Sequence, residues 1–241
     1  MGKLAAMLFV ILSLYTFADD LKLEKTLVLN QIEQIKQKDS WPEKKIVLIA
    51  GAAALSAYCF DENIEKWAKR YPEDGGYSAM RSIFNGFGSK EVLVLPAGCY
   101  AFGTITENEK LKAASFTSLE SVFTASCFTI AIKSVIGRER PENEKGAYDY
   151  KPFNVNDAWN SMPSGHSTAA WAVFTPFAVY YDNKWIYIIP AGVSIARVVS
   201  DKHWASDVIA GGIIGYTVGY FMSHKNSEKI EFTGSGFKIK F

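Results

Sequence analysis

Six apolar runs, separated by polar connections, constrain the fold of this chain more than any other feature. They cover residues 46–60, 92–105, 113–136, 167–181, 185–199 and 208–222. Most are about 15 residues long and rich in Ala, Leu, Ile and Phe, and none alternates regularly between apolar and polar residues as a half-buried strand does. The runs therefore predict an all-α fold, a helical bundle of about six main helices.

The length of the runs leaves two environments open for these helices. About 15 residues suit a buried core helix, whereas a membrane span needs about 20. The mean hydropathy of +0.01 is low for a chain made mostly of membrane helices, and Glu120 and Arg197 place charges inside two of the runs. We therefore expect a protein that is soluble or peripheral to the membrane, with an integral inner-membrane protein as the alternative.

The first 18 residues have the pattern of a signal peptide. Lys3 supplies the charged start, residues 4–17 the apolar stretch, and Thr16 and Ala18 the small residues before a cleavage site. The alternative is an uncleaved membrane helix, but the apolar stretch is shorter than the ~20 residues that a bilayer requires. We expect cleavage after Ala18 and export to the periplasmic side.

Two segments flank the helical body, which we place at residues 46–225. Residues 19–45 have one apolar helical stripe and then a break at Pro42, which predicts an amphipathic helix and a linker. In the tail, residues 226–241, apolar residues alternate with charged ones on both sides of the turn sequence "TGSG". This pattern predicts a small C-terminal β-hairpin.

The composition of the chain narrows its partners. A net charge of +1 offers no strongly basic surface, so we expect no nucleic-acid partner. Cys59, Cys99 and Cys127 lie inside apolar runs, where cysteine acts as a small hydrophobe, and we expect no disulfide framework. No histidine or cysteine spacing suits a metal site, so we expect neither a metal nor another cofactor.

The first chemically informative cluster is "KSVIGRERP", residues 133–141. Lys133 is embedded in an apolar helix, where its charge needs a partner. Arg140 follows seven residues later, two helical turns away and on the same face if the helix continues that far. A lysine point charge and an arginine fork on one face suit a phosphate group. Arg138 lies between them, and we expect it to be solvated.

The second cluster is "PSGH", residues 163–166. Ser164 and Gly165 precede a helix that begins near His166. The free N–H groups and the positive dipole end of a helix N-terminus bind anions, and glycine permits close backbone approach. Ser164 also fits the role of a plain N-cap, so this tetrapeptide alone favours neither reading.

The third cluster contains Arg197, His203 and Asp207. His203 and Asp207 are four residues apart and share a face if they lie on a helix. A carboxylate bonded to one imidazole nitrogen fixes the tautomer and leaves the other nitrogen free to react. The alternative is a surface His–Asp pair that caps a helix. His224, in a polar segment, is expected to be exposed.

The three clusters together carry a family resemblance. Alternate connections of an up-and-down bundle open on the same end, so the clusters can converge. Their order and spacing, over residues 133–215, resemble the three-part signature of the type 2 phosphatidic acid phosphatase superfamily. That group includes bacterial acid phosphatases, membrane lipid phosphatases and vanadium haloperoxidases. The family usually has serine before the arginine of the third motif, and this chain has Ala196.

The resemblance and the chemistry imply the same roles. His203 would attack phosphorus and form a phosphohistidine, which Asp207 orients and stabilises. His166 would protonate the leaving oxygen and then activate water. The phosphate-binding residues would be Lys133, Arg140, Ser164, Gly165 and Arg197, which offset developing charge without a metal.

The expected function is a metal-independent phosphatase acting on a phosphate ester or diphosphate. The apolar body and the 14% aromatic content favour a lipid of the phosphatidate, prenyl diphosphate or lipid A type, and the membrane surface as a partner. A soluble, broad-specificity periplasmic acid phosphatase on small phosphoesters is the first alternative. Further alternatives are a vanadium-dependent haloperoxidase, because vanadate mimics phosphate, and a catalytically inactive binding protein.

Overall fold

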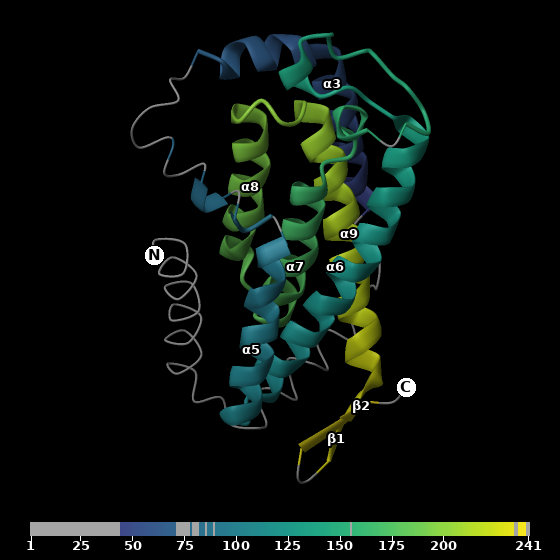
Figure 1. Ribbon diagram of the computed structural model, residues 1–241. Coiled ribbons are helices and arrows are strands. Elements are labelled where there is room, and N and C mark those ends of the chain that lie inside the picture. The colour runs from purple at the N-terminus through teal and green to yellow at the C-terminus, as the bar shows by residue number, and fades with distance from the viewer. Residues whose placement is uncertain are drawn as a thin grey trace.

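Six main helices form a bundle in the part of the chain that the structure describes (Figure 1). The computed structural model describes residues 44–70, 78, 82–84, 86–88, 90–154, 156–233 and 236–239. The main helices are α3 (Lys44–Ala68), α5 (Val94–Ile105), α6 (Glu109–Ile136), α7 (Gly165–Tyr180), α8 (Ile188–Val199) and α9 (Ala205–Lys229). Short 3-10 helices are η1 (Lys90–Leu93), η2 (Pro141–Asn143), η3 (Asp157–Trp159) and η4 (Lys184–Tyr187). Each predicted run overlaps one main helix, which confirms the predicted all-α bundle. The expected signal peptide and nearly all of the expected segment 19–45 lie outside the described residues.

Three helices extend well beyond, or begin before, the predicted runs. α3, α6 and α9 contain 25, 28 and 25 residues. The run-based boundaries were too short because polar residues continue a helix after its apolar stretch ends. At the start of α6, for example, the Asn108 side chain accepts a hydrogen bond of 2.9 Å from the Leu111 N–H. This cap makes the helix begin at Glu109, four residues before the predicted run.

The end of α6 decides how the first motif is arranged. Gly137 adopts the left-handed conformation (φ 59°) and its N–H bonds to the Lys133 carbonyl at 2.9 Å. The helix therefore stops before Arg140, and the expected shared helix face for Lys133 and Arg140 does not exist. Arg140 is instead carried by the connection of residues 137–164.

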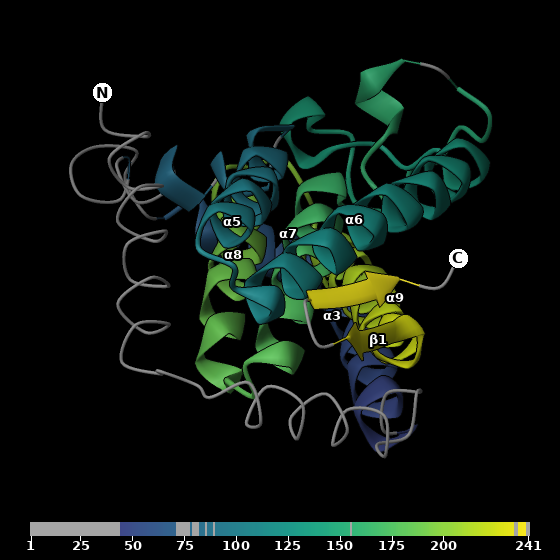
Figure 2. The same cartoon turned by 90° about the horizontal axis from the view of Figure 1, so that it is seen from below.

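α7 lies in the middle of the bundle, with α6, α8 and α9 packed against it (Figure 2). Its buried side chains include Val173, Phe174 and Phe177, each at most 1% exposed. α9 approaches α7 through Gly211 and Gly215. A Cβ on Gly211 would lie 2.5 Å from the Ser164 carbonyl oxygen, and one on Gly215 would lie 2.3 Å from that of Thr168. Small residues four apart thus allow backbone-to-backbone contact between the two helices.

The interior position of His224 differs from the expectation. The side chain is 2% exposed, not solvated. Because α9 continues to Lys229, this segment remains helical and keeps its inner face in the bundle. The His224 Nδ1 lies 2.9 Å from the Tyr220 carbonyl oxygen, and the two rings are 4.4 Å apart.

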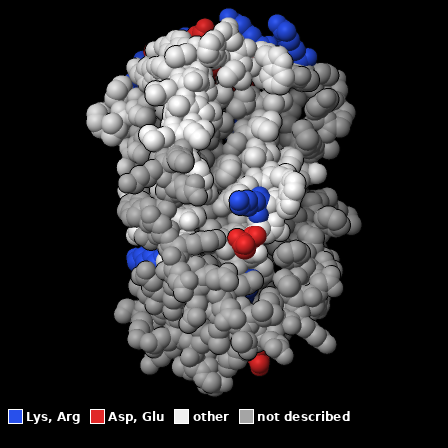
Figure 3. Space-filling model, turned by 180° about the vertical axis from the view of Figure 1, so that it is seen from behind, with Lys and Arg blue, Asp and Glu red and all other residues white. Residues whose placement is uncertain are grey.

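The exterior of the described helices is markedly apolar. Side chains more than half exposed include Leu48, Ile49, Leu55, Ile105, Phe123, Phe128, Ile130, Trp185, Ile188 and Ile195. Cys59 and Cys127 are also exposed, and Cys99 is buried. On the rear face, charged atoms gather mainly at the upper rim, with a few small charged patches lower down (Figure 3). Among the described residues, α6 alone is a helix long and apolar enough to cross a bilayer.

The C-terminal strands form the predicted hairpin. β1 (Ile230–Thr233) and β2 (Gly236–Ile239) pair antiparallel, with Ile230 opposite Ile239. The hairpin lies at the opposite end of the bundle from the α8–α9 connection (Figure 1).

Candidate active site

Three segments meet at the end of the bundle that we call the site end. They are the connection 137–164 after α6, the N-terminus of α7 and the α8–α9 connection. Backbone hydrogen bonds join them: the Ser161 N–H donates to the Arg138 carbonyl at 3.0 Å, and the Ser164 N–H to that of Asp207 at 2.9 Å. The three sequence motifs are therefore held together by main-chain contacts, as the bundle topology predicted.

The N-terminus of α7 brings the second motif against Lys133. Ser164 is the N-cap, with its Oγ 3.5 Å from the Ser167 nitrogen, and the helix begins at Gly165. A Cβ on Gly165 would lie 3.9 Å from Lys133 Cε, so the lysine chain runs beside the helix terminus. The Lys133 ammonium donates to the carbonyl of Asn160 and, at 3.4 Å, to that of Ser161. These two carbonyls are the polar partners that we expected for Lys133 from its position in an apolar helix.

Two arginines complete a group of positive side chains. Arg140 donates through Nε to the Asp157 carbonyl at 3.0 Å and through a terminal nitrogen to the Asp157 carboxylate at 2.8 Å. That carboxylate is 81% exposed, so its hold on Arg140 is screened by solvent. Arg197, near the end of α8, is 8% exposed. We call Lys133, Arg140 and Arg197 the cation cluster.

The two histidines of the motifs lie among these cations. Burial, followed by the charge of Arg197, lowers the pKa of His166 to about 3; His203, Arg140 and Lys133 act in the same direction. Burial also lowers the pKa of His203 to about 4, although Asp207 opposes the shift. Both imidazoles are therefore neutral at neutral pH, and both sense a strongly positive environment.

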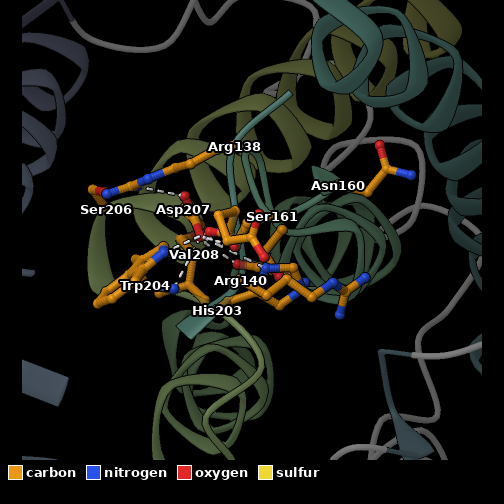
Figure 4. A network of polar contacts seen from close by, with 12 residues as sticks. Arg138, Arg140, Asn160, Ser161, His203, Trp204, Ser206, Asp207 and Val208 are labelled. Carbon is orange, nitrogen blue, oxygen red and sulfur yellow. Dashed lines mark hydrogen bonds and ion pairs between the residues drawn. The ribbon is translucent and has the colours of Figure 1, made fainter. Parts of the chain in front are cut away.

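Asp207 stands next to His203 without bonding to it. The His203 Nδ1 lies 3.8 Å from Asp207 Oδ2, longer than a hydrogen bond. The same oxygen accepts from the Trp204 N–H at 2.9 Å and from the Ser161 hydroxyl at 2.5 Å (Figure 4). A small ring movement would complete the His–Asp bond, and hydrogen bonds at catalytic sites commonly tighten when substrate binds.

Arg138 is the clearest error of the sequence-based interpretation. It is fully buried, not solvated, and its guanidinium bonds to the carboxylates of Asp61 and Asp207 at 2.7 Å each. Both carboxylates outweigh the effect of burial and raise the pKa of Arg138.

Three more polar residues around Asp207 had no sequence signal that singled them out. They are Asp61, Ser161 and Ser206, all fully buried. The available hint was their place in the sequence: Ser161 lies two residues before the second motif, and Ser206 lies inside the third. Asp61 directly follows an apolar run and belongs to no motif.

Fold and site together define a class: a helical bundle with two neutral histidines beside a cluster of cations, a suitable receptor for a tetrahedral oxyanion. Groups of His, Cys, Asp and Glu that would hold a metal ion do not occur among the described residues.

Comparison with known proteins points to the same family as the motifs. Residues 114–231, just under half of the chain, match the PAP2 superfamily. α3, which carries Asp61, precedes the matched region.

Curated relatives and a solved structure agree with this assignment. A lipid A 1-phosphatase of Rhizobium johnstonii is 36% identical over 88 residues, 35% of this chain and 36% of that protein. A lipid A 1-phosphatase of Porphyromonas gingivalis is 40% identical over 68 residues, 26% of this chain and 15% of that protein. The chain thus spans little more than a third of the first relative and less of the second. A transmembrane PAP2 type phosphatidylglycerolphosphate phosphatase from Bacillus subtilis has a similar fold, with a TM-score of 0.56 and 23% identity, covering 76% of this chain and 93% of that chain.

Proposed function

We propose that this protein is a metal-independent phosphatase that hydrolyses a phosphate ester or diphosphate of a lipid through a phosphohistidine intermediate. The single observation that carries the proposal is the position of two neutral histidines, one beside a buried carboxylate, among three cations. The names of the curated relatives support the lipid substrate.

The first half of the reaction transfers the phosphoryl group to His203. Its Nδ1 is turned toward Asp207, which leaves Nε2 as the attacking atom. The N–P bond forms as the bond from phosphorus to the leaving oxygen breaks, and His166 gives that oxygen a proton. Asp207 accepts a hydrogen bond from Nδ1 and stabilises the positive imidazole ring.

The second half returns the enzyme to its starting state. His166, now neutral, takes a proton from water as the water oxygen attacks phosphorus and the N–P bond breaks. Inorganic phosphate leaves, and His203 is again neutral. The cation cluster, the Ser164 hydroxyl and the Gly165 N–H hold the phosphoryl oxygens throughout.

His166 needs a proton to act as the acid, although its pKa is about 3. A phosphate ester brings up to two negative charges among the cations that lower this pKa. The substrate therefore counteracts the cluster and raises the pKa of His166 toward the range in which it can donate. In this way the acid becomes competent only beside its substrate.

The apolar exterior supports a lipid substrate and a membrane location. Exposed side chains such as Leu55 and Phe123, each more than 70% exposed, would be costly to leave in water over so large a surface. α6 has the length and apolarity of a membrane span. These features favour the integral alternative over a peripheral or soluble protein. Export to the periplasmic side stays a prediction.

Phosphate release from matched substrates tests the proposal. The purified protein in detergent micelles is assayed with phosphatidate, a prenyl diphosphate, lipid A and a short-chain phosphomonoester, with and without a chelator. We expect His203→Ala to abolish release from lipid substrates, while His224→Gln, which changes a histidine outside the site, retains it. Substantial turnover by folded His203→Ala would exclude this nucleophile, and activity that requires added metal would exclude the metal-free mechanism.

A second comparison separates the lipid phosphatase from a soluble acid phosphatase. A strong preference for the short ester, together with release of the protein from membranes by a carbonate wash, would favour the soluble enzyme. We expect the lipid to be preferred and the protein to be retained in the membrane fraction.

A further inference from the structure

Asp207 belongs to a buried group of four polar residues. We call it the buried tetrad; its members are Asp61, Arg138, Ser206 and Asp207, each at most 1% exposed. The Arg138 guanidinium bridges the two carboxylates at 2.7 Å each and also donates to the Ser206 hydroxyl at 2.7 Å. That hydroxyl donates to Asp61 Oδ2 at 2.5 Å. Such a network has one favoured geometry, because each member is bonded to at least two others or to the main chain.

Asp61 also fixes the start of the helix that carries Asp207. Its Oδ1 accepts a hydrogen bond of 2.9 Å from the Ser206 N–H, in the first turn of α9. A carboxylate at this point satisfies a free N–H group and interacts favourably with the helix dipole. Because Asp61 lies on α3, the docking of that helix determines where α9 begins.

Arg138 fixes the orientation of the Asp207 carboxylate itself. It bonds to Oδ1, while Ser161 and the Trp204 N–H bond to Oδ2. A carboxylate has about four acceptor positions. These three donors hold both oxygens of the carboxylate, and Oδ2 is the oxygen that faces the His203 Nδ1.

The charges of the tetrad indicate why Arg138 is paired with Asp61 as well as with Asp207. Arg138 alone would neutralise Asp207 and weaken its effect on His203. Asp61, on the other side of the guanidinium, restores one net negative charge to the group of two carboxylates and one cation. That charge favours the positive imidazole of a phosphohistidine.

We propose that Asp61 and Arg138 are positioning residues that hold the carboxylate of Asp207 in place and keep its surroundings negative without touching the substrate. Asp207 in turn orients His203. This inference rests on the proposed function and adds to it a requirement for α3, which lies outside the region matched to the family.

The test is steady-state kinetics against pH for Asp61→Asn, with a lipid phosphate in micelles. We expect kcat to fall roughly 10- to 100-fold, as for a misplacement of about 1 Å, with KM changed less than about 2-fold. Removing a negative charge makes protonated His203 less stable, so the acid limb of the kcat/KM profile should move to lower pH by roughly 0.5–1 unit. The ionisable groups that face His203 are Lys133 on α6, Arg140 on the connection 137–164, His166 on α7 and Asp207 on α9; all remain unchanged.

Lys69→Gln is the matched control. Lys69 ties the end of α3 to Asp201 in the α8–α9 connection at 3.2 Å, but it does not touch the tetrad. We expect its kcat and acid limb to match those of the wild type. If Asp61 had only a structural role, its replacement would instead let water into the site. The acid limb of the kcat/KM profile would then move up toward about pH 6.5, the ordinary pKa of histidine.

Further variants keep the proposal falsifiable if Asp61→Asn does not fold. Arg138→Lys keeps the positive charge but loses the guanidinium that reaches both carboxylates. The kcat should therefore fall, while the acid limb of the kcat/KM profile should not shift. Ser206→Ala should lower kcat roughly 2- to 5-fold at constant KM. Wild-type kinetics in a folded Asp61→Asn or Arg138→Lys protein would overturn the positioning role while leaving the phosphatase intact. A wild-type protein that releases no phosphate would overturn the proposed function instead.

Discussion

The contact between α7 and α9 allows a quantitative test of how the fold positions the site. Gly211→Ala places a methyl group 2.5 Å from the Ser164 carbonyl oxygen and 3.0 Å from Thr168 Oγ1. Ordinary contact begins near 3.4 Å, so the helices must separate by about 0.9 Å at this point. Overpacking of this kind costs about 1–3 kcal/mol, and the higher helix propensity of alanine offsets up to about 1 kcal/mol. The expected net loss is therefore roughly 1–2 kcal/mol.

The activity of the same variant should fall by more than its stability suggests. Ser164 is the residue that caps α7, next to Gly165 and His166, and the clash pushes on its carbonyl. A displacement near 1 Å at a catalytic group lowers rates by about 10²-fold. We expect Gly211→Ala to lose this much in kcat, measured as phosphate release, while its melting temperature falls by only about 2–8 °C.

Two other glycines provide the controls for this experiment. Gly215→Ala meets the Thr168 carbonyl at 2.3 Å, one helical turn further from the site, and should lose at least as much stability but less activity. Gly51→Ala, in α3, adds a methyl with nothing within 4 Å and should be neutral or slightly stabilising. Equal losses of kcat for Gly211→Ala and Gly215→Ala, or a Gly211→Ala enzyme within about 2-fold of wild type, would refute the reasoning.

Three further predictions concern the ionisable groups of the site. His203 attacks when neutral, and its lowered pKa of about 4 predicts that the acid limb of the kcat/KM profile lies near pH 4; an acid limb between pH 6 and 7 would contradict this. Asp157→Asn removes the charge of the solvent-exposed partner of Arg140 and should lower KM by about 2- to 5-fold without changing kcat. An unchanged KM would show that the Arg140–Asp157 ion pair does not compete with substrate. Ser161→Ala removes a donor to Asp207 and should lower kcat roughly 10-fold in stopped assays at saturating substrate, whereas an effect confined to KM would place Ser161 at the phosphate.

The helices were predictable from local patterns because each apolar run carries enough information to specify a helix by itself. The N-terminus of α7 is the best example, since Ser164 and Gly165 are a cap and a helix start in the sequence and in the structure. The ends of α3, α6 and α9 were less predictable. Polar residues such as those after Phe60 continue a helix only because another helix packs beside it, and tertiary packing overrides local propensity there.

The buried ion pairs could not be predicted for a different reason. Asp61 and Arg138 are 77 residues apart, and nothing local marks either as a partner of the other. A charged residue without a known partner is expected at the surface, because burial of a single charge is costly. Arg138 is the exception because two carboxylates from other segments meet it, and only the assembled bundle brings them together.

The site end therefore has two layers of charge, with His203 between them. In the proposed mechanism the cation cluster lies on the substrate side. Burial, aided by Lys133 and Arg140, lowers the pKa of His203 and keeps the nucleophile neutral. The same cations would oppose the positive ring of a phosphohistidine. The buried tetrad, with its net negative charge, lies on the other side and compensates for that opposition. Each layer has its own part: the tetrad stabilises the positive ring of the intermediate, and the cations hold the phosphoryl oxygens and help burial to keep His203 neutral. Asp61 of α3 and Arg138 of the connection 137–164 thereby contribute to the reaction without touching the substrate.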